Sequence, residues 1–155
     1  MIKLKRILVP TDFSETANVA LWYARELAQS LGASIHLLHV VPEMFGPGRT
    51  GHGFVPDLNR YAETIRQQAA ARLTTVLTAS ERDELHAQFA TRIGAPFVEI
   101  VRYAKEQEID LIVMGTHGRG PVAHMLMGSV AERVVRKAPC PVLTVRHPEH
   151  EFVMP

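Results

Sequence analysis

The chain has 155 residues, the length of about one domain of common size. Hydrophobic residues make up 46% of it and charged residues 21%, values near the globular average that exclude a disordered chain. The 17 Lys and Arg residues against 16 Asp and Glu leave a net charge of +1, too small for a field that would gather nucleic acid or a lipid surface. Any anion must therefore be bound by a local site.

The single cysteine, Cys140, cannot form an intramolecular disulfide, which favours a reducing, cytoplasmic setting. The basic start of the chain resembles the first part of a signal peptide, but the apolar run behind it is only Ile7-Leu8-Val9. We therefore expect no export by that route. No apolar stretch approaches the roughly 18 residues of a membrane span, so no membrane association is expected.

The first predicted elements are a strand, a turn and a helix. Ile7-Leu8-Val9 is typical of a parallel strand buried on both faces. Ser14 is a candidate N-cap for a helix with apolar residues at helical spacing, and Gly32 ends that pattern. A second strand is expected over 34–41. The segment 42–56 holds four glycines and three prolines, which predicts a long loop without regular structure.

The remaining elements alternate in the same way, and the strand that follows the second helix has polar interruptions that suit a sheet edge. In chain order we expect a helix from Leu58 to about Ser80, a strand over 86–93, a helix beginning near Phe97, a strand over 111–114 that stops at Gly115, a helix from Ser129 to Arg136-Lys137, and a last strand over 141–145.

Strands that alternate with helices predict parallel βαβ units, and hence an open α/β sheet with helices on both faces. The two purely aliphatic strands, which begin at Ile7 and Leu111, should be central neighbours. Ligands of such sheets bind beyond the carboxyl ends of the strands, where the direction of connection reverses. The turn at 10–14 and the segment 115–129 should therefore meet there.

Glycine is concentrated in that second segment, in Gly115-Thr116-His117-Gly118-Arg119-Gly120. Glycine lets backbone N–H groups approach a phosphate, and the helix that opens after Gly128 adds unpaired donors with partial positive charge. The order of residues matches neither the P-loop nor the dinucleotide fingerprint. Phosphotransfer of the P-loop kind and dinucleotide oxidoreduction are therefore not supported.

Several side chains have more than one interpretation. Ser129 and Glu132 match a capping box, so Ser129 serves the helix, a phosphate, or both. Asp12 is suited to binding a ribose hydroxyl or a metal, or to shaping the turn. Arg119 pairs with a phosphate or is simply solvated. His36 and His39 lie three apart on one strand and so face opposite sides, which argues against a shared metal.

Three segments together resemble the universal stress protein family. Gly115-x2-Gly118-x9-Gly128-Ser129 is similar to the family's G-2x-G-9x-G-S/T nucleotide signature. The segment 10–15 resembles the family's first turn, and 141–145 its closing strand. The similarity extends to about Arg146, which implies one domain over 1–146 and a tail over 147–155. A metal site in that tail, at His147 and His150, is not expected.

The resemblance implies a Rossmann-like fold of the adenine nucleotide alpha hydrolase-like type, with five parallel strands in the order 3-2-1-4-5. It also implies that the chain binds ATP or AMP, with Mg²⁺ bridging the phosphates. Carried over by position, the nucleotide-binding residues are Pro10, Thr11 and Asp12 for adenosine, Val40 for the adenine edge, Gly115, His117, Gly118 and Arg119 for sugar and phosphates, and Gly128, Ser129 and Val130 for the phosphate tail.

The leading functional hypothesis is a cytoplasmic nucleotide-binding regulator of the stress response that forms a homodimer through the last strand, Val142 to Val145. No catalytic residue is assigned, because the loop offers only His117 and Arg119 to a phosphoryl transfer. The alternative is a slow ATP hydrolase or phosphotransferase that uses the same pocket. A third hypothesis is a dimeric adaptor with a vestigial pocket, and a receiver domain phosphorylated on Asp12 is disfavoured because the acidic cluster for Mg²⁺ is missing.

Overall fold

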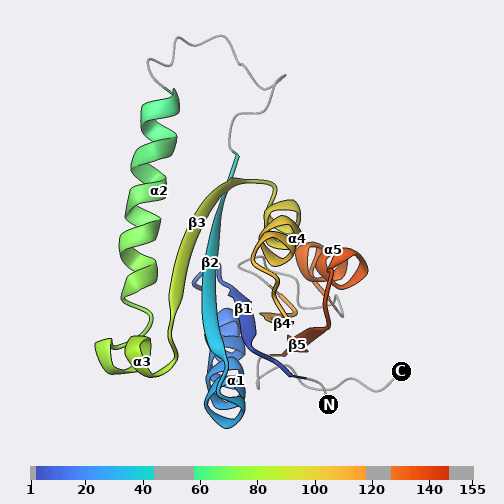
Figure 1. Cartoon of the computed structure of the whole chain (residues 1–155). Coiled ribbons are helices and arrows are strands. Elements are labelled where there is room, and N and C mark those ends of the chain that lie inside the picture. The colour runs from blue at the N-terminus through green and yellow to red at the C-terminus, as the bar shows by residue number, and fades with distance from the viewer. Residues whose placement is uncertain (1–2, 44–57, 118–126, 147–155) are drawn as a thin grey trace.

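The computed structural model describes residues 3–43, 58–117 and 127–146, and Figure 1 shows their arrangement. Strands and helices alternate along the chain as expected. The elements are β1 (Arg6–Pro10), α1 (Glu15–Leu31), β2 (Ser34–Pro42), α2 (Leu58–Thr74), α3 (Ala79–Glu84), β3 (Gln88–Gly94), α4 (Pro96–Glu106), β4 (Leu111–Gly115), α5 (Ser129–Lys137) and β5 (Val142–Val145).

The strands form one five-stranded sheet in the order β3-β2-β1-β4-β5, and every neighbouring pair is parallel. This confirms the predicted fold class and strand order. β1 and β4 are central neighbours, and their side chains Ile7, Leu8, Ile112 and Val113 are fully buried. A strand covered on both faces needs apolar residues at successive positions, which is why these two read as unbroken aliphatic runs.

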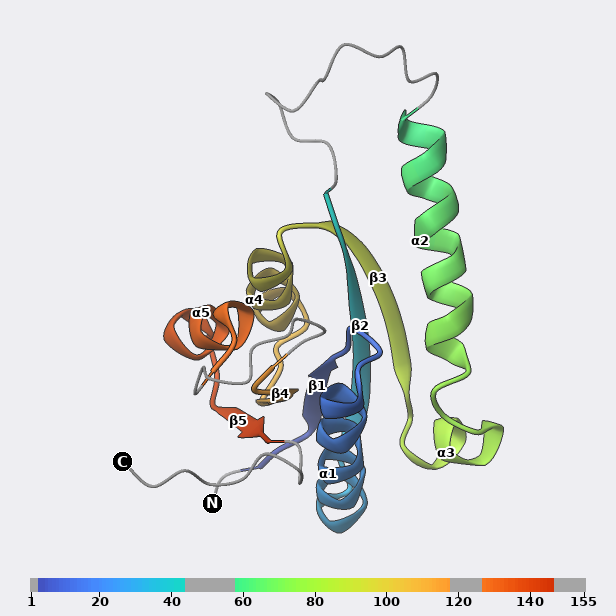
Figure 2. The ribbon, with the colours of Figure 1, turned by 180° about the vertical axis from the view of Figure 1, so that it is seen from behind.

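Helices cover both faces of the sheet (Figures 1 and 2). Helices α1 and α2 lie on one face, where Ala20, Ala24 and Leu73 pack against the odd-numbered residues of β1 and β2. Helices α4 and α5 lie on the other, where Ile100 and Val134 pack against the even-numbered ones. The sheet thus separates two apolar layers.

Local signals set the bounds of α1 as predicted. The Ser14 Oγ accepts a hydrogen bond from the Ala17 N–H at 3.2 Å, which caps the first turn. Gly32 follows the helix in the left-handed conformation, with φ of 64°, and Ala33 then donates to the Ala28 carbonyl. Glycine adopts that conformation without steric cost, so the helix ends there.

The expected helix from Leu58 to about Ser80 is confirmed as far as Thr74 and is wrong beyond it. Helix α2 ends at Thr74, and the short α3 begins at Ala79. Thr78 and Glu81 form a capping box that starts α3, with the Thr78 Oγ1 accepting from the Glu81 N–H and the Glu81 carboxylate accepting from the Thr78 N–H. This capping box begins a second helix within the range where one helix was expected.

The predicted edge strand is confirmed at the edge, with later bounds. His86 has φ of 44°, a left-handed conformation that no strand residue adopts, so β3 starts at Gln88. Strand β2 runs to Pro42, and the predicted loop beyond it falls largely on residues 44–57, outside the described ranges.

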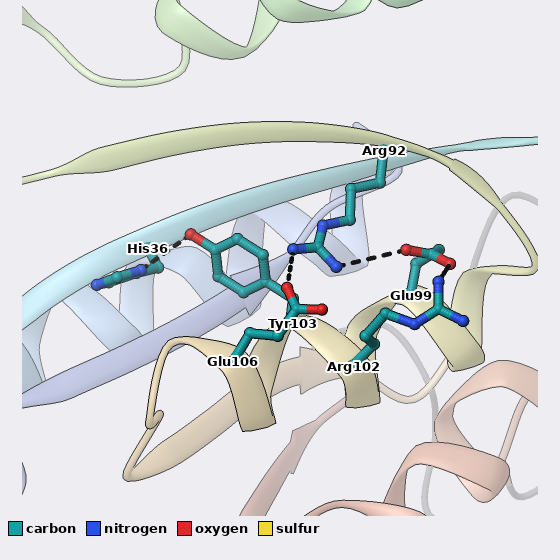
Figure 3. A network of polar contacts seen from close by, with 6 residues as sticks. All are labelled: His36, Arg92, Glu99, Arg102, Tyr103 and Glu106. Carbon is teal, nitrogen blue, oxygen red and sulfur yellow. Dashed lines mark hydrogen bonds and ion pairs between the residues drawn. The ribbon is translucent and has the colours of Figure 1, made fainter.

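A polar network joins β2, β3 and α4 on the face that α4 covers (Figure 3). The Nδ1 of His36 lies 3.0 Å from the Tyr103 hydroxyl. Arg92 pairs with Glu99 at 3.5 Å and with Glu106, while Arg102 also pairs with Glu99. Burial, aided by the nearby positive charge of Arg6, lowers the pKa of His36 below its usual 6.5. His36 is therefore a neutral core residue in this environment.

Among the described helices, none combines the length and apolar character that a bilayer crossing requires.

Candidate functional site

The turns that follow β1 and β4 lie side by side at the carboxyl edge of the sheet. The strands pair with Ile7 opposite Leu111 and Leu8 opposite Ile112, so the residues after Pro10 stand level with Gly115 and those that follow it. A Cβ placed on Gly115 would lie 2.6 Å from the Thr16 Cγ2 of α1, so β4 ends in direct contact with the helix that follows the first turn. The predicted meeting of the two segments is confirmed for their described residues.

Hydrogen bonds shape the first turn. The Thr11 N–H donates to the Leu38 carbonyl at 2.9 Å, and the Thr11 Oγ1 accepts from the Phe13 N–H at 3.0 Å. The Asp12 Oδ1 accepts from the Ser14 N–H at 3.0 Å. Such a carboxylate-to-backbone bond two residues along is an Asx turn, so the turn-shaping role considered for Asp12 is confirmed. This bond engages Oδ1 of the carboxylate.

Phe13 carries backbone strain in this turn. Its φ of 63° is left-handed, which costs an L-residue with a bulky side chain roughly 1–2 kcal/mol. The Phe13 ring lies 4.6 Å from the His39 ring and 4.2 Å from the Arg72 guanidinium carbon. The His39 Nδ1 donates to the Thr11 carbonyl at 2.8 Å, since a carbonyl oxygen only accepts. These contacts hold the strained turn from β2 and α2.

Sequence reasoning missed this role of His39, because it considered the residue only as a metal ligand. His36 and His39 do face opposite sides of the sheet, as predicted: His36 reaches Tyr103 on α4, and His39 reaches the first turn. Within the described ranges, no three His, Cys, Asp or Glu side chains gather into a group that could hold a metal. The histidines of the segment 147–150 lie outside those ranges.

The backbone of Val40 faces the end of β1. Ser34 donates its N–H to Lys5, and the Leu38 carbonyl accepts from Thr11, so even-numbered residues of β2 direct their peptide groups toward β1. Pairing of β1 with β2 ends at Pro10 and Leu38, two residues before Val40. The peptide groups of Val40 therefore point toward the first turn, while its side chain is buried in the core beneath α4.

Thr116 organises the second turn. Its N–H donates to the Val145 carbonyl at 2.9 Å, which ties β4 to the end of β5. Its carbonyl accepts from the Gly128 N–H at 2.6 Å, which places the start of α5 beside the end of β4. Its hydroxyl lies 3.0 Å from the His117 Nδ1. Sequence reasoning missed Thr116, which the structure buries; its position directly after a predicted central strand was the available signal.

Helix α5 begins at Ser129 as predicted, but its cap differs from the capping-box interpretation. Gly128 is the N-cap, with an extended φ of −69° and ψ of 156°, and among the described residues no side chain caps the helix. Ser129 is therefore the first helical residue, and the predicted capping box with Glu132 is wrong, because a capping serine must itself hold the extended N-cap conformation. The first backbone N–H groups of α5 have no intrahelical acceptors, and no described side chain caps them.

Both described glycines of the predicted signature lie where an added Cβ would meet close neighbours. Gly115 contacts Thr16, and a Cβ on Gly128 would lie 3.0 Å from the Thr116 carbonyl oxygen. Gly118 and Arg119, two further predicted binding residues, lie outside the described ranges. The structure thus brings Pro10, Thr11 and Asp12 to the same edge as Gly115, His117 and the start of α5.

The model of the universal stress protein family matches residues 3–146, and the chain belongs to this family. Universal stress protein MJ0531 of Methanocaldococcus jannaschii is 33% identical over 147 residues, which cover 95% of this chain and 85% of that protein.

Solved structures of related proteins share the fold. The structure of protein MJ0577, a universal stress protein of the same archaeon, superimposes with a TM-score of 0.77 at 28% identity, and the match covers 96% of this chain and 99% of that one. A universal stress protein from Archaeoglobus fulgidus in complex with dAMP matches with a TM-score of 0.56 at 25% identity, over 94% of this chain and 99% of that one.

Proposed function

We propose that the chain binds an adenine nucleotide, ATP or AMP, at the carboxyl edge of its sheet. The observation that carries the proposal is the start of α5: a glycine N-cap that no described side chain caps, tied to the end of β4 and level with the turn that holds Asp12. A helix N-terminus presents N–H donors and partial positive charge, which suit a phosphate. A relative of the same fold, crystallised with dAMP, supports the adenine nucleotide as the ligand.

Each part of the nucleotide has a counterpart at this edge. The phosphate tail lies against Gly128, Ser129 and Val130, where the exposed Ser129 hydroxyl is not used for capping. The ribose lies by Asp12, whose Oδ2 complements the Oδ1 already held by Ser14. The adenine edge meets the peptide groups of Val40. Pro10, Thr11, Gly115, His117, Gly118 and Arg119 complete the proposed lining.

Mg²⁺ in this proposal is bound through the phosphates of ATP. The described residues hold no carboxylate cluster for a resident metal, so the nucleotide supplies the ligands and Asp12 stays with the ribose.

Calorimetric titration with ATP and with AMP tests the proposal. Asp12→Asn keeps an oxygen for the Ser14 N–H and removes the charge. Ser129→Ala removes a hydroxyl that does not cap the helix. Each substitution should therefore weaken ATP binding by about tenfold with little loss of stability. Gly32→Ala is the matched control: it strains the left-handed residue after α1, should cost about 1 kcal/mol of stability, and should leave ATP affinity unchanged. Absence of ATP and AMP binding by the wild-type chain would refute the proposal.

The competing activity is slow hydrolysis of ATP in the same site. His117 is a described side chain of the site with acid–base chemistry, and the Thr116 hydroxyl lies 3.0 Å from its Nδ1. Multiple turnovers, measured at saturating ATP, that disappear in His117→Ala would establish an enzyme. We propose a binding protein and expect no turnover that depends on this residue.

The proposed regulator acts as a cytoplasmic homodimer in the stress response. β5 is an edge strand of the described sheet, paired with β4 on one side, and Leu143 on it is 38% exposed. An open edge with an apolar side chain invites pairing with a second copy. Thr144→Pro removes a backbone donor from this edge and should convert the dimer to monomer in sedimentation. A wild-type monomer at micromolar concentration would contradict this part of the proposal.

A further inference from the structure

The imidazole of His39, on the neighbouring strand β2, supports the first turn of the site. Thr11 precedes Asp12, and the His39 Nδ1 donates to the Thr11 carbonyl at 2.8 Å. Phe13 follows Asp12, and its ring lies 4.6 Å from the His39 ring. One side chain therefore contacts both residues that flank Asp12.

The conformation of the turn explains why such a support is needed. Phe13 has a φ of 63°, which a bulky L-residue adopts only where surrounding contacts impose it. The Thr11 N–H and hydroxyl anchor the turn to β2 and to the Phe13 N–H. The Thr11 carbonyl is the remaining polar group of that residue, and His39 binds it. Without this bond, the peptide that joins Thr11 to Asp12 loses its hydrogen bond to β2.

We propose that His39 is a positioning residue for nucleotide binding, which fixes the peptide before Asp12 and so the direction in which the Asp12 carboxylate points. This inference rests on the proposed function. His39 acts through Asp12 and lies on the face of the sheet opposite the side chain of Val40, its neighbour in sequence. Two consecutive residues of β2 thus serve one site, Val40 by its backbone and His39 by its ring.

Two substitutions separate the hydrogen bond from the ring. In His39→Asn the amide nitrogen stands on the same carbon as the imidazole Nδ1, so the donor to Thr11 is retained and the ring contact with Phe13 is lost. In His39→Leu the donor is lost and apolar bulk is kept. We expect ATP binding, measured by calorimetry, to weaken about tenfold in His39→Leu and to stay within about threefold of wild type in His39→Asn.

A double-mutant cycle tests the path through Asp12. If His39 acts by orienting that carboxylate, Asp12→Ala should weaken ATP in the wild-type chain and have little further effect in His39→Leu. Tyr103→Phe is the control. It removes the hydrogen-bond partner of His36, which lies on β2 like His39 but faces the opposite side of the sheet. This variant should lower stability and keep ATP affinity within about twofold of wild type.

The outcomes are distinguishable from failure of the proposed function. If His39→Leu binds ATP as tightly as wild type, the role of His39 is overturned and the proposed function stands. The same holds if His39→Leu and His39→Asn weaken ATP binding equally, or if the effects of His39→Leu and Asp12→Ala are fully additive. Absence of ATP binding by wild type would overturn both proposals. Amide exchange of Phe13 and Ser14 in the unliganded protein, faster in His39→Leu than in His39→Asn, is the expected signature of a loosened turn.

Discussion

Substitution of Gly115 by alanine should destabilise the fold through one defined clash. The new Cβ would lie 2.6 Å from the Thr16 Cγ2 and 3.2 Å from the Thr16 backbone carbon. Carbon atoms at van der Waals contact stand about 3.5–4.0 Å apart, so α1 and β4 must separate. Both elements belong to the buried core, where there is little room for that movement.

The expected cost of Gly115→Ala is about 1–3 kcal/mol, the usual price of overpacking a well-filled core. For a chain of this length each kcal/mol lowers Tm by about 2–4 °C, so the variant should melt roughly 2–12 °C below wild type. Urea titration followed by circular dichroism measures the free energy directly.

Thr16→Ser supplies the decisive comparison, because it removes the Cγ2 methyl that lies 2.6 Å from the new Cβ and keeps the hydroxyl. In a Thr16→Ser background, Gly115→Ala should cost clearly less than it does alone. An equal loss of stability on Gly115→Ala in both backgrounds would refute the packing explanation. The remaining explanation for this glycine would then be close approach of its backbone to a ligand.

Three further outcomes concern the polar network on the α4 face. Because burial lowers the pKa of His36 in the folded state, the unfolded chain takes up its proton first, and stability should fall as pH drops below about 6.5; urea unfolding at pH 7.5 and 5.5 should show a smaller loss for His36→Gln than for wild type. Tyr103→Phe leaves the His36 Nδ1 without its partner and should lower the free energy of unfolding by about 1–3 kcal/mol. An unchanged free energy of unfolding would show that this hydrogen bond does not stabilise the fold. Arg92 lowers the pKa of Glu106 mainly by a hydrogen bond, so Arg92→Met should raise it toward its usual value in an NMR titration, and an unchanged titration would contradict the pairing.

Much of the fold could be predicted, because the signals are local. The aliphatic runs at Ile7 and Leu111 identify the central strands, and Ser14 and Gly32 bound α1. Caps act within one helical turn, so the residues around them suffice. The split between α2 and α3 was also local, in the Thr78 capping box, but a continuous apolar pattern hid it.

The start of α5 shows where local reading failed. Ser129 and Glu132 have the spacing of a capping box, yet the serine is already helical. The Gly128 N–H is bound by the Thr116 carbonyl, and a Cβ there would approach that oxygen to 3.0 Å. Thr116, twelve residues away, thus favours glycine at the N-cap position. The residues around Ser129 do not reveal this contact.

By itself the sequence determined the alternation of elements, the parallel sheet with two covered faces, and the two segments that meet at its carboxyl edge, because periodicity and caps depend on near neighbours. Only the tertiary structure decided that His39 holds the turn of Asp12 and that Gly115 is a packing requirement. These contacts join residues from different strands and helices, and their existence depends on register and helix placement, which no short window of sequence encodes.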